Sequence, residues 1–143
     1  GQLAQEVDDW EAKSAAAYAR GDGVAGRDAR AYGERARRWI ARLDDLPEGE
    51  TFAVQFSVHR LGDAFWVTCG GEPYNIIQVE LRRRFPDFPI MLSPVSGDLQ
   101  VAYLLPEDRY GKGLYQEEPS ILGKGCLEGL TKAIGERVEE MID

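Results

Sequence analysis

The sequence has few of the residues that most metal sites, disulfide scaffolds and hydrolase triads use. It contains one histidine, His59, and two cysteines, Cys69 and Cys126. Two cysteines do not make a disulfide framework, and neither has the short Cys or His spacing of a zinc knuckle. One imidazole cannot build a metal site by itself, and there is no G-x-S-x-G segment. We therefore expect both cysteines to be free thiols packed in the interior.

Long apolar runs and excess positive charge are also absent. No apolar run approaches the roughly 20 residues that cross a bilayer, and the N-terminal segment GQLAQEVDDWEAK lacks the basic and apolar regions of a secretion signal. The 143 residues include 25 acids and 17 bases, a net charge of -8 that repels phosphate backbones and anionic lipid. These features argue against a transmembrane segment and against a nucleic-acid partner.

Two helical patterns open the chain. Apolar residues at helical spacing predict one helix from Leu3 to Tyr18 and a second helix that Asp28 caps and that runs to about Leu43. The intervening RGDGVAGRD contains three glycines, which favour a reversal over a continuous helix. This segment therefore predicts an αα-hairpin.

After residue 49 the apolar period changes from helical to two, which is typical of a half-buried strand. The pattern predicts strands at TFAVQFSVHR and AFWVTC, a helix at YNIIQVELRRRF, two strands at IMLSPV and LQVAYLL, and a last helix with Leu127, Leu130, Ile134, Val138 and Met141 on its buried side. The order ααββαββα indicates an α/β layered domain with a mixed sheet, a helical hairpin at the N-terminus and a C-terminal helix. No linker is evident, so we expect residues 1–143 to form a single domain.

Glu72 is the strongest single candidate for a functional residue. It follows Gly70 and Gly71 at the end of a predicted strand, and Pro73 suits the first position of a helix. Unpaired amides at such a helix start favour an anion, and a carboxylate held there can bind a metal or act as a base. A plain capping role for Glu72 is the alternative.

Tyrosines form the second candidate group. Tyr103 ends a predicted strand, and Tyr110 and Tyr115 follow in a glycine-bearing loop. A phenol is a hydrogen-bond donor and acceptor and, beside a metal, an anionic oxygen ligand. Taken alone, tyrosines in this context are more typical of amphipathic packing with the hydroxyl at the surface. His59 falls on the solvent side of its strand and is better explained as a surface group.

The combination of these segments resembles a known family. The order of a strand ending in GGEPYN, a helix, PIMLSPVSGDLQVAY, LLPEDRY, GLYQEE and a closing helix is similar to the late part of the catalytic domain of the neutral/alkaline (non-lysosomal) ceramidases. In that family a Gly-Glu pair supplies a glutamate that binds zinc, and a later tyrosine also binds zinc. Glu72 and Tyr103 match those positions. Tyr115 matches a further tyrosine that contacts the scissile amide, so the resemblance implies a catalytic role for it.

The resemblance implies a zinc-dependent amidohydrolase of sphingolipid metabolism, which hydrolyses an N-acyl amide such as ceramide to a fatty acid and an amine. It also implies a secreted or cell-envelope parent protein. The two zinc histidines of the family lie upstream of the matched part, and His59 matches neither. Residues 1–143 would therefore be the C-terminal half of a larger catalytic domain, with histidine ligands supplied by the remainder of the same polypeptide. Two oxygen ligands hold zinc weakly, so the chain alone is expected to be inactive and to bind little or no zinc.

Some positions depart from the family pattern. Gly70 stands where the family usually has proline, Asp98 and Ala102 where it usually has asparagine and glycine, and Gln116 where it usually has glutamate. The alternative function is therefore a non-catalytic binding or structural module that retains the fold with degenerate ligand positions. A weaker third hypothesis is a protein-binding surface on the helical hairpin, anchored by tryptophans 10 and 39; we favour packing of both tryptophans onto the sheet.

Overall fold

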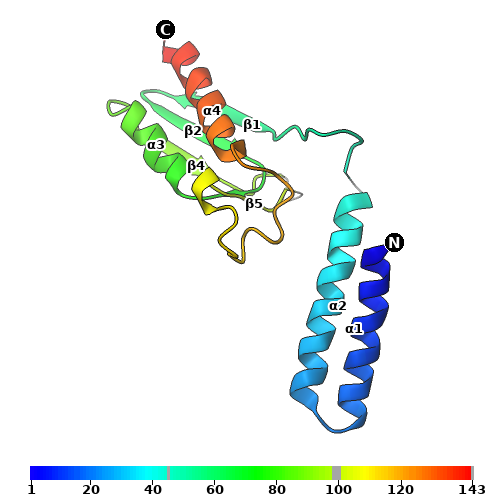
Figure 1. The fold of residues 1–143 in the computed structure, drawn as a ribbon. Helices are drawn as coiled ribbons and strands as arrows, with labels where there is room; N and C mark the ends of the chain where they lie inside the picture. The colour runs from blue at the N-terminus through cyan, green and yellow to red at the C-terminus, as the bar shows by residue number, and fades with distance from the viewer. Residues whose placement is uncertain (45, 98–100, 143) are drawn as a thin grey trace. The chain divides into compact units, whose positions relative to one another are not determined.

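The chain forms two compact units, Gly1–Glu50 and Thr51–Asp143 (Figure 1). The computed structural model describes residues 1–44, 46–97 and 101–142. The predicted α/β class is confirmed: a helical hairpin opens the chain, a mixed sheet follows and a helix closes it. Within the described ranges, no helix is long and apolar enough to cross a membrane. A single domain over residues 1–143 stays a prediction.

The first unit is a hairpin of helices α1 (Gln2–Ala19) and α2 (Gly23–Asp44) joined by a short turn. Small side chains let the two helices approach closely; the buried residues are Val7, Ser14, Ala17, Gly26, Ala29, Gly33 and Ala36. The Ser14 hydroxyl donates a 2.8 Å hydrogen bond to the Gly26 carbonyl across the pair. A Cβ at Gly26 would lie 2.9 Å from the ring of Tyr18. Glycine at this position therefore makes room for the aromatic ring.

The start of α2 differs from the sequence-based expectation. Of the three glycines in the reversal, only Gly21 has a positive φ, at 81°, while Gly23 and Gly26 are helical. The Asp22 carboxylate accepts a 3.0 Å hydrogen bond from the Ala25 amide. Asp22, not Asp28, therefore caps the helix. The cost of helical glycine, about 1 kcal/mol each, is opposed by the close packing that Gly26 permits.

The second unit is built around a three-stranded sheet in the order β1–β2–β4. Strands β1 (Phe56–Leu61) and β2 (Ala64–Cys69) are antiparallel, and β4 (Ile90–Ser93) pairs with β2 in parallel after the crossover helix α3 (Ile76–Arg84). The predicted period of two is confirmed from residue 51 to residue 59, where half-buried and exposed residues alternate.

One face of this sheet and two helices enclose the core. Helix α4 (Cys126–Ile142) and α3 both cover that face (Figure 1). Within this core cluster, the side chains that are at most 2% exposed are Phe65, Val67, Cys69, Ile77, Leu81, Ile90, Val101, Leu104, Leu127, Ile134 and Val138. The Arg84 guanidinium of α3 crosses above Gly135 of α4 and forms a 2.7 Å ion pair with Glu139. This contact joins the two helices at their solvent side.

A second, two-stranded sheet was not foreseen from the sequence. Strand β3 (Glu72–Pro73) pairs in parallel with β5 (Tyr103–Leu104), and a short 3-10 helix η1 (Glu107–Arg109) follows. The expectation that Pro73 begins a helix is wrong, because α3 begins at Ile76. The expected strand 99–105 is ladder-paired only at Tyr103 and Leu104, while residues 99 and 100, like Asp98, lie outside the described residues.

The position of the α2 cap gives a direct test. Replacing Asp22 with Ala removes the side-chain acceptor for the Ala25 amide and should cost about 1 kcal/mol of hairpin stability. Asp28→Ala is the matched control, because Asp28 lies inside the helix and is exposed. We expect it to change the free energy of unfolding by less than about 0.5 kcal/mol. Urea unfolding followed by helical circular dichroism measures both; equal losses would contradict the assignment of the cap.

Candidate functional site

The structure places Glu72 and Tyr103 side by side. They are direct register partners in the parallel pair β3–β5, and neighbouring strands lie about 4.8 Å apart with paired side chains on the same face. The Glu72 amide donates a 2.7 Å hydrogen bond to the Ala102 carbonyl, and the Tyr74 amide donates one of 3.0 Å to the Leu104 carbonyl. Backbone pairing therefore places the two residues next to each other on neighbouring strands.

Tyr115 joins this pair from the loop that precedes α4. Its ring packs edge-on against the Tyr103 ring, with 6.1 Å between the centroids, and the residue is 66% exposed. Three hydrogen bonds hold the surrounding loop. The Glu117 carboxylate accepts one each from the amides of Gly111 and Gly113, and the Ser120 hydroxyl donates one of 2.7 Å to the Tyr103 carbonyl. All three predicted site residues thus lie in one cluster.

Electrostatics distinguishes Tyr103 from an ordinary surface tyrosine. Desolvation by burial raises the pKa of its phenol, and the negative charge of Glu72 and the neighbouring phenols of Tyr115 and Tyr74 raise it further. Tyr103 therefore keeps its proton in the absence of a nearby cation. A cation bound between Glu72 and Tyr103 would oppose these effects, because positive charge favours the phenolate.

Tyr74 is a member of the cluster that sequence reasoning missed. It follows Glu72 by two residues along an extended segment, so both side chains fall on the same side of the strand. That spacing was a usable signal, but it was hidden by the expectation that the helix begins at Pro73. Helix α3 begins three residues later, after Asn75. Glu72 therefore neither caps α3 nor lies at its first turn, and both parts of that expectation are corrected.

Gly71 determines how the chain enters the site. Its φ is +69°, and a Cβ would lie 2.6 Å from side-chain atoms of Leu104 and Val101 and 3.0 Å from the Ala102 carbonyl oxygen. The Gly71 carbonyl also accepts a 2.8 Å hydrogen bond from the Val95 amide. Only glycine combines this backbone conformation with so close an approach to β5.

Two residues without glycine's freedom adopt left-handed backbone conformations beside Gly71. Val95 has a φ of 57° and Ala102 a φ of 52°. Left-handed conformations cost an L-residue about 1–2 kcal/mol, and such strain concentrates at functional sites. Ala102 is a position at which glycine would adopt the observed φ at lower cost.

The other candidate residues have structural roles. The Tyr110 hydroxyl donates a 2.8 Å hydrogen bond to the Leu122 carbonyl, and burial raises the pKa of this phenol. His59 is exposed, as expected, with its ring 5.6 Å from the Trp66 ring. Both cysteines are free; Cys69 is buried, which raises the pKa of its thiol, whereas Cys126 is only partly buried. In the described part of the chain, no group of three His, Cys, Asp or Glu side chains is arranged to hold a metal ion.

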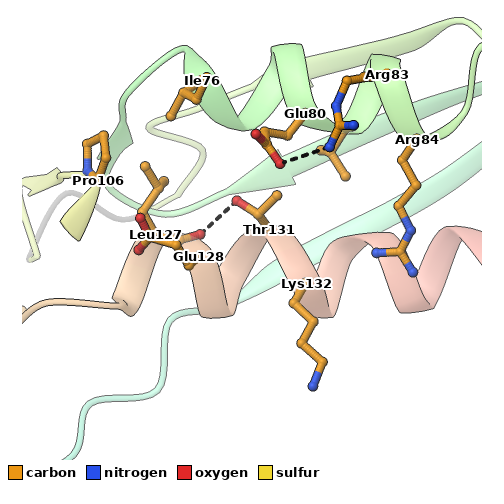
Figure 2. A pocket seen from close by; sticks show the side chains of 10 residues that line it. Ile76, Glu80, Arg83, Arg84, Pro106, Leu127, Glu128, Thr131 and Lys132 are labelled. Atoms are coloured by element: carbon orange, nitrogen blue, oxygen red, sulfur yellow. Dashed lines mark hydrogen bonds and ion pairs between the residues drawn. The ribbon is translucent and has the colours of Figure 1, made fainter. Parts of the chain in front are cut away.

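A groove of about 460 Å³ between α3 and α4 is a separate feature (Figure 2). Glu80, Arg83, Arg84, Glu128 and Lys132 contribute its charged side chains, around an apolar floor. Each already has a partner: Glu80 pairs with Arg83 in the groove, and the other three contact residues outside it. None of the three predicted site residues lines this groove. The groove therefore offers fewer groups for catalysis or metal binding than the Glu72 cluster does.

Comparison with protein-family models, curated proteins and solved structures finds no match. The contacts of the cluster itself therefore carry the functional argument.

The close approach at Gly71 predicts a large effect of one added methyl group. Gly71→Ala introduces both left-handed strain and overlap with buried side chains, so we expect a loss of about 3 kcal/mol in the free energy of unfolding. Gly62→Ala is the matched control, since Gly62 has a φ of +64° with nothing within 4 Å of its Cβ position. The free energy of unfolding of Gly62→Ala should fall by only about 1 kcal/mol. Urea unfolding of both variants measures the difference, and equal losses would show that β3 is not held tightly against β5.

The raised pKa of Tyr103 predicts a loss of stability at alkaline pH. The pKa of the phenol is higher in the folded state than in the unfolded state, where it is about 10. The contribution of the protonated Tyr103 phenol to stability is therefore fully present below about pH 10 and is lost as pH rises through the folded-state pKa. The free energy of unfolding of Tyr103→Phe should decline less steeply between about pH 9 and pH 11 than that of the parent chain. Urea midpoints across this range test it, with Tyr18→Phe in the other unit as control; identical slopes for Tyr103→Phe and the parent would contradict the prediction.

Proposed function

We propose that this chain supplies part of the metal site of a zinc-dependent amidohydrolase of the neutral ceramidase kind, which hydrolyses an N-acyl amide such as ceramide. Glu72 and Tyr103 would be two of the metal ligands, and Tyr115 would contact the reacting amide. The single observation that carries the proposal is the direct pairing of Glu72 with Tyr103, with the Tyr115 ring against Tyr103.

The donor set fits a partial zinc site. A carboxylate and a phenol offer two oxygen ligands from adjacent strands, and both strands are held by backbone hydrogen bonds. Zinc prefers nitrogen or sulfur for most of its ligands, so histidines from the remainder of the same polypeptide would complete the site. Two oxygen donors alone bind zinc weakly, and the isolated chain is expected to be inactive.

Each residue of the cluster has a distinct chemical task in this proposal. Bound zinc supplies an activated water with a pKa near about 7 and a polarised carbonyl. Glu72 holds the cation through its carboxylate. Tyr103 would hold the cation through its phenol oxygen. Tyr115, exposed at the edge of the cluster, donates a hydrogen bond to the oxygen that becomes negative as the amide is attacked.

The electrostatics supports a cation in preference to an anion. Desolvation by burial is the first cause of the raised Tyr103 pKa, and the negative charge of Glu72 is the next. The Glu72 carboxylate lowers the potential at the phenol oxygen and attracts positive charge. This supports metal binding over anion binding as the task of the cluster, and it leaves the non-catalytic module as the alternative function.

The proposal predicts that Glu72 is required for zinc content and activity in the longer protein encoded by the same gene. Glu72→Gln keeps the size of the side chain but removes its charge, so we expect less bound zinc and at least about 100-fold slower hydrolysis of an N-acyl amide. Glu107→Gln, an exposed carboxylate in η1, is the matched control and should leave both unchanged. Elemental analysis and fatty-acid release measure the two quantities.

Equal zinc content and equal activity in Glu72→Gln and the parent protein would remove Glu72 from the mechanism. A longer protein that binds no zinc and releases no fatty acid would support the non-catalytic module. For residues 1–143 alone, calorimetric titration should show zinc binding weaker than about 1 µM, since only two oxygen donors are present. Submicromolar binding by this chain would contradict the need for ligands from elsewhere.

A further inference from the structure

Tyr115 lies at the exposed edge of the Glu72 cluster, outside any strand or helix. The residue is 66% exposed, and its ring meets the Tyr103 ring edge-on, with 6.1 Å between the centroids. A side chain with that much free surface gains little orientation from packing. The backbone that carries Tyr115 must therefore hold the phenol in place if it is to act on a substrate.

Tyr115 occupies the second position of a tight turn. The turn runs from Leu114 to Glu117 and is closed by a 3.0 Å hydrogen bond from the Glu117 amide to the Leu114 carbonyl. The turn sets the local backbone around Tyr115, but it does not pair with β5. The placement of Tyr115 next to Tyr103 therefore depends on contacts made by the residues around the turn.

Glu117, the last residue of the turn, folds its side chain back across the loop. Its Oε1 accepts a 2.7 Å hydrogen bond from the Gly111 amide, and its Oε2 accepts one of 3.3 Å from the Gly113 amide. Hydrogen bonds to an ionised carboxylate are roughly twice as strong as neutral ones. The carboxylate thus closes residues 111–117, which include Tyr115, into a ring.

The amides of Gly111 and Gly113 reach one carboxylate because both glycines have left-handed backbone. Their φ values are 75° and 68°, and nothing lies within 4 Å of either Cβ position. Backbone conformation, and not lack of space, therefore explains glycine at both positions. Amides turned inward in this way form a concave site for an anion, and here the Glu117 carboxylate of the same loop occupies it.

The turn is also attached to β5 on its other side. The Ser120 amide donates a 3.3 Å hydrogen bond to the Glu117 carbonyl, and the Ser120 hydroxyl donates one of 2.7 Å to the Tyr103 carbonyl. Glu117 is therefore linked through its backbone to the strand that carries Tyr103 and through its carboxylate to the start of the loop. These two links together limit the positions that Tyr115 can take.

We propose that Glu117 is a positioning residue, whose carboxylate holds the Tyr115 phenol against the Glu72–Tyr103 pair. This inference rests on the proposed function, in which Tyr115 contacts the reacting amide. Glu117 itself does not touch that amide and acts through the backbone of the turn. Its loss would release the phenol from the position in which it donates to the developing oxyanion, so it would slow the chemical step more than it weakens substrate binding.

Residues 1–143 test the positioning role without zinc or activity. Glu117→Gln keeps one oxygen acceptor but places an NH₂ group where the other backbone amide donates. Nuclear magnetic resonance should show nuclear Overhauser contacts between the rings of Tyr103 and Tyr115 in the parent chain and their loss in Glu117→Gln. Hydrogen exchange at the Gly111 amide should become at least about tenfold faster.

Glu107→Gln is the matched control, because it makes the same change at an exposed carboxylate in η1. It should alter neither the ring contacts nor the exchange rate. Gly111→Ala provides a second variant should Glu117→Gln not fold. It strains the donor side of the same hydrogen bonds, since the φ of Gly111 is +75° and its Cβ position is open.

Kinetics of the longer protein encoded by the same gene test the consequence for catalysis. In Glu117→Gln we expect kcat for hydrolysis of an N-acyl amide to fall at least about tenfold, with KM changed less than about threefold. In a Tyr115→Phe background, Glu117→Gln should change kcat less than about twofold, because the two residues act as a unit. A merely structural role of Glu117 would lower kcat equally in both backgrounds.

Unchanged ring contacts between Tyr103 and Tyr115 in Glu117→Gln would overturn the inference, as would an equal loss of kcat in the two backgrounds. A longer protein that hydrolyses no N-acyl amide would instead remove the proposed function. The ring contacts in residues 1–143 would then decide alone whether Glu117 positions Tyr115. The failure of the inference and the failure of the proposed function are therefore distinguishable.

Discussion

The close passage of the Gly71 backbone along β5 is the constraint on which the candidate site depends. At Gly71 there is no room for a side chain between the backbone and the side chains of Val101 and Leu104. That contact brings β3 within hydrogen-bonding distance of β5 and fixes a register in which Glu72 faces Tyr103. The carboxylate and the phenol are therefore positioned by backbone packing rather than by a bond between their own side chains.

The strain beside this contact fits the same interpretation. Val95 and Ala102 both adopt left-handed conformations, and Val95 donates its amide to the Gly71 carbonyl. The left-handed conformation is costly for a β-branched residue, and burial offsets little of the cost because Val95 is 44% exposed. The two backbone segments that hydrogen-bond to Gly71 and Glu72 therefore each contain a residue in an unfavourable conformation. Such strain persists only where the surrounding contacts determine the conformation.

Sequence patterns predicted the elements whose stability is local. The period of two in residues 51–59 and the helical spacing in the hairpin both matched the structure, because burial on one face of a strand or helix leaves a direct trace in the sequence. The predicted start of α2 was wrong because packing overrode helix propensity. Gly26 lies under the Tyr18 ring, and glycine there is favourable despite its cost in a helix. Strand β3 was missed because its partner strand is about 30 residues away along the chain and no local sequence pattern indicates a two-residue ladder.

The residues of the cluster could be named from the sequence, but the way in which they come together could not. Glu72, Tyr103 and Tyr115 were singled out by their places at strand ends and in a glycine-bearing loop, and the resemblance suggested their roles, whereas their convergence depends on the β3–β5 pairing, which no periodicity contains. The expected helix dipole at Glu72 is replaced by a parallel strand pair. Tyr74 shows the consequence, since its membership of the cluster follows from extended backbone at Pro73 and could not follow from a helix starting there.

Strand β2 connects the candidate site with the outer face of the β1–β2–β4 sheet. Its inward residues, Phe65 and Val67, bury completely against the helices, while Trp66 lies on the uncharged outer face. The same strand then leads through Gly70 and Gly71 to Glu72. Because the inward side chains of β2 are completely buried, the point at which the chain turns toward Glu72 is determined by the packing of Phe65 and Val67 in the core.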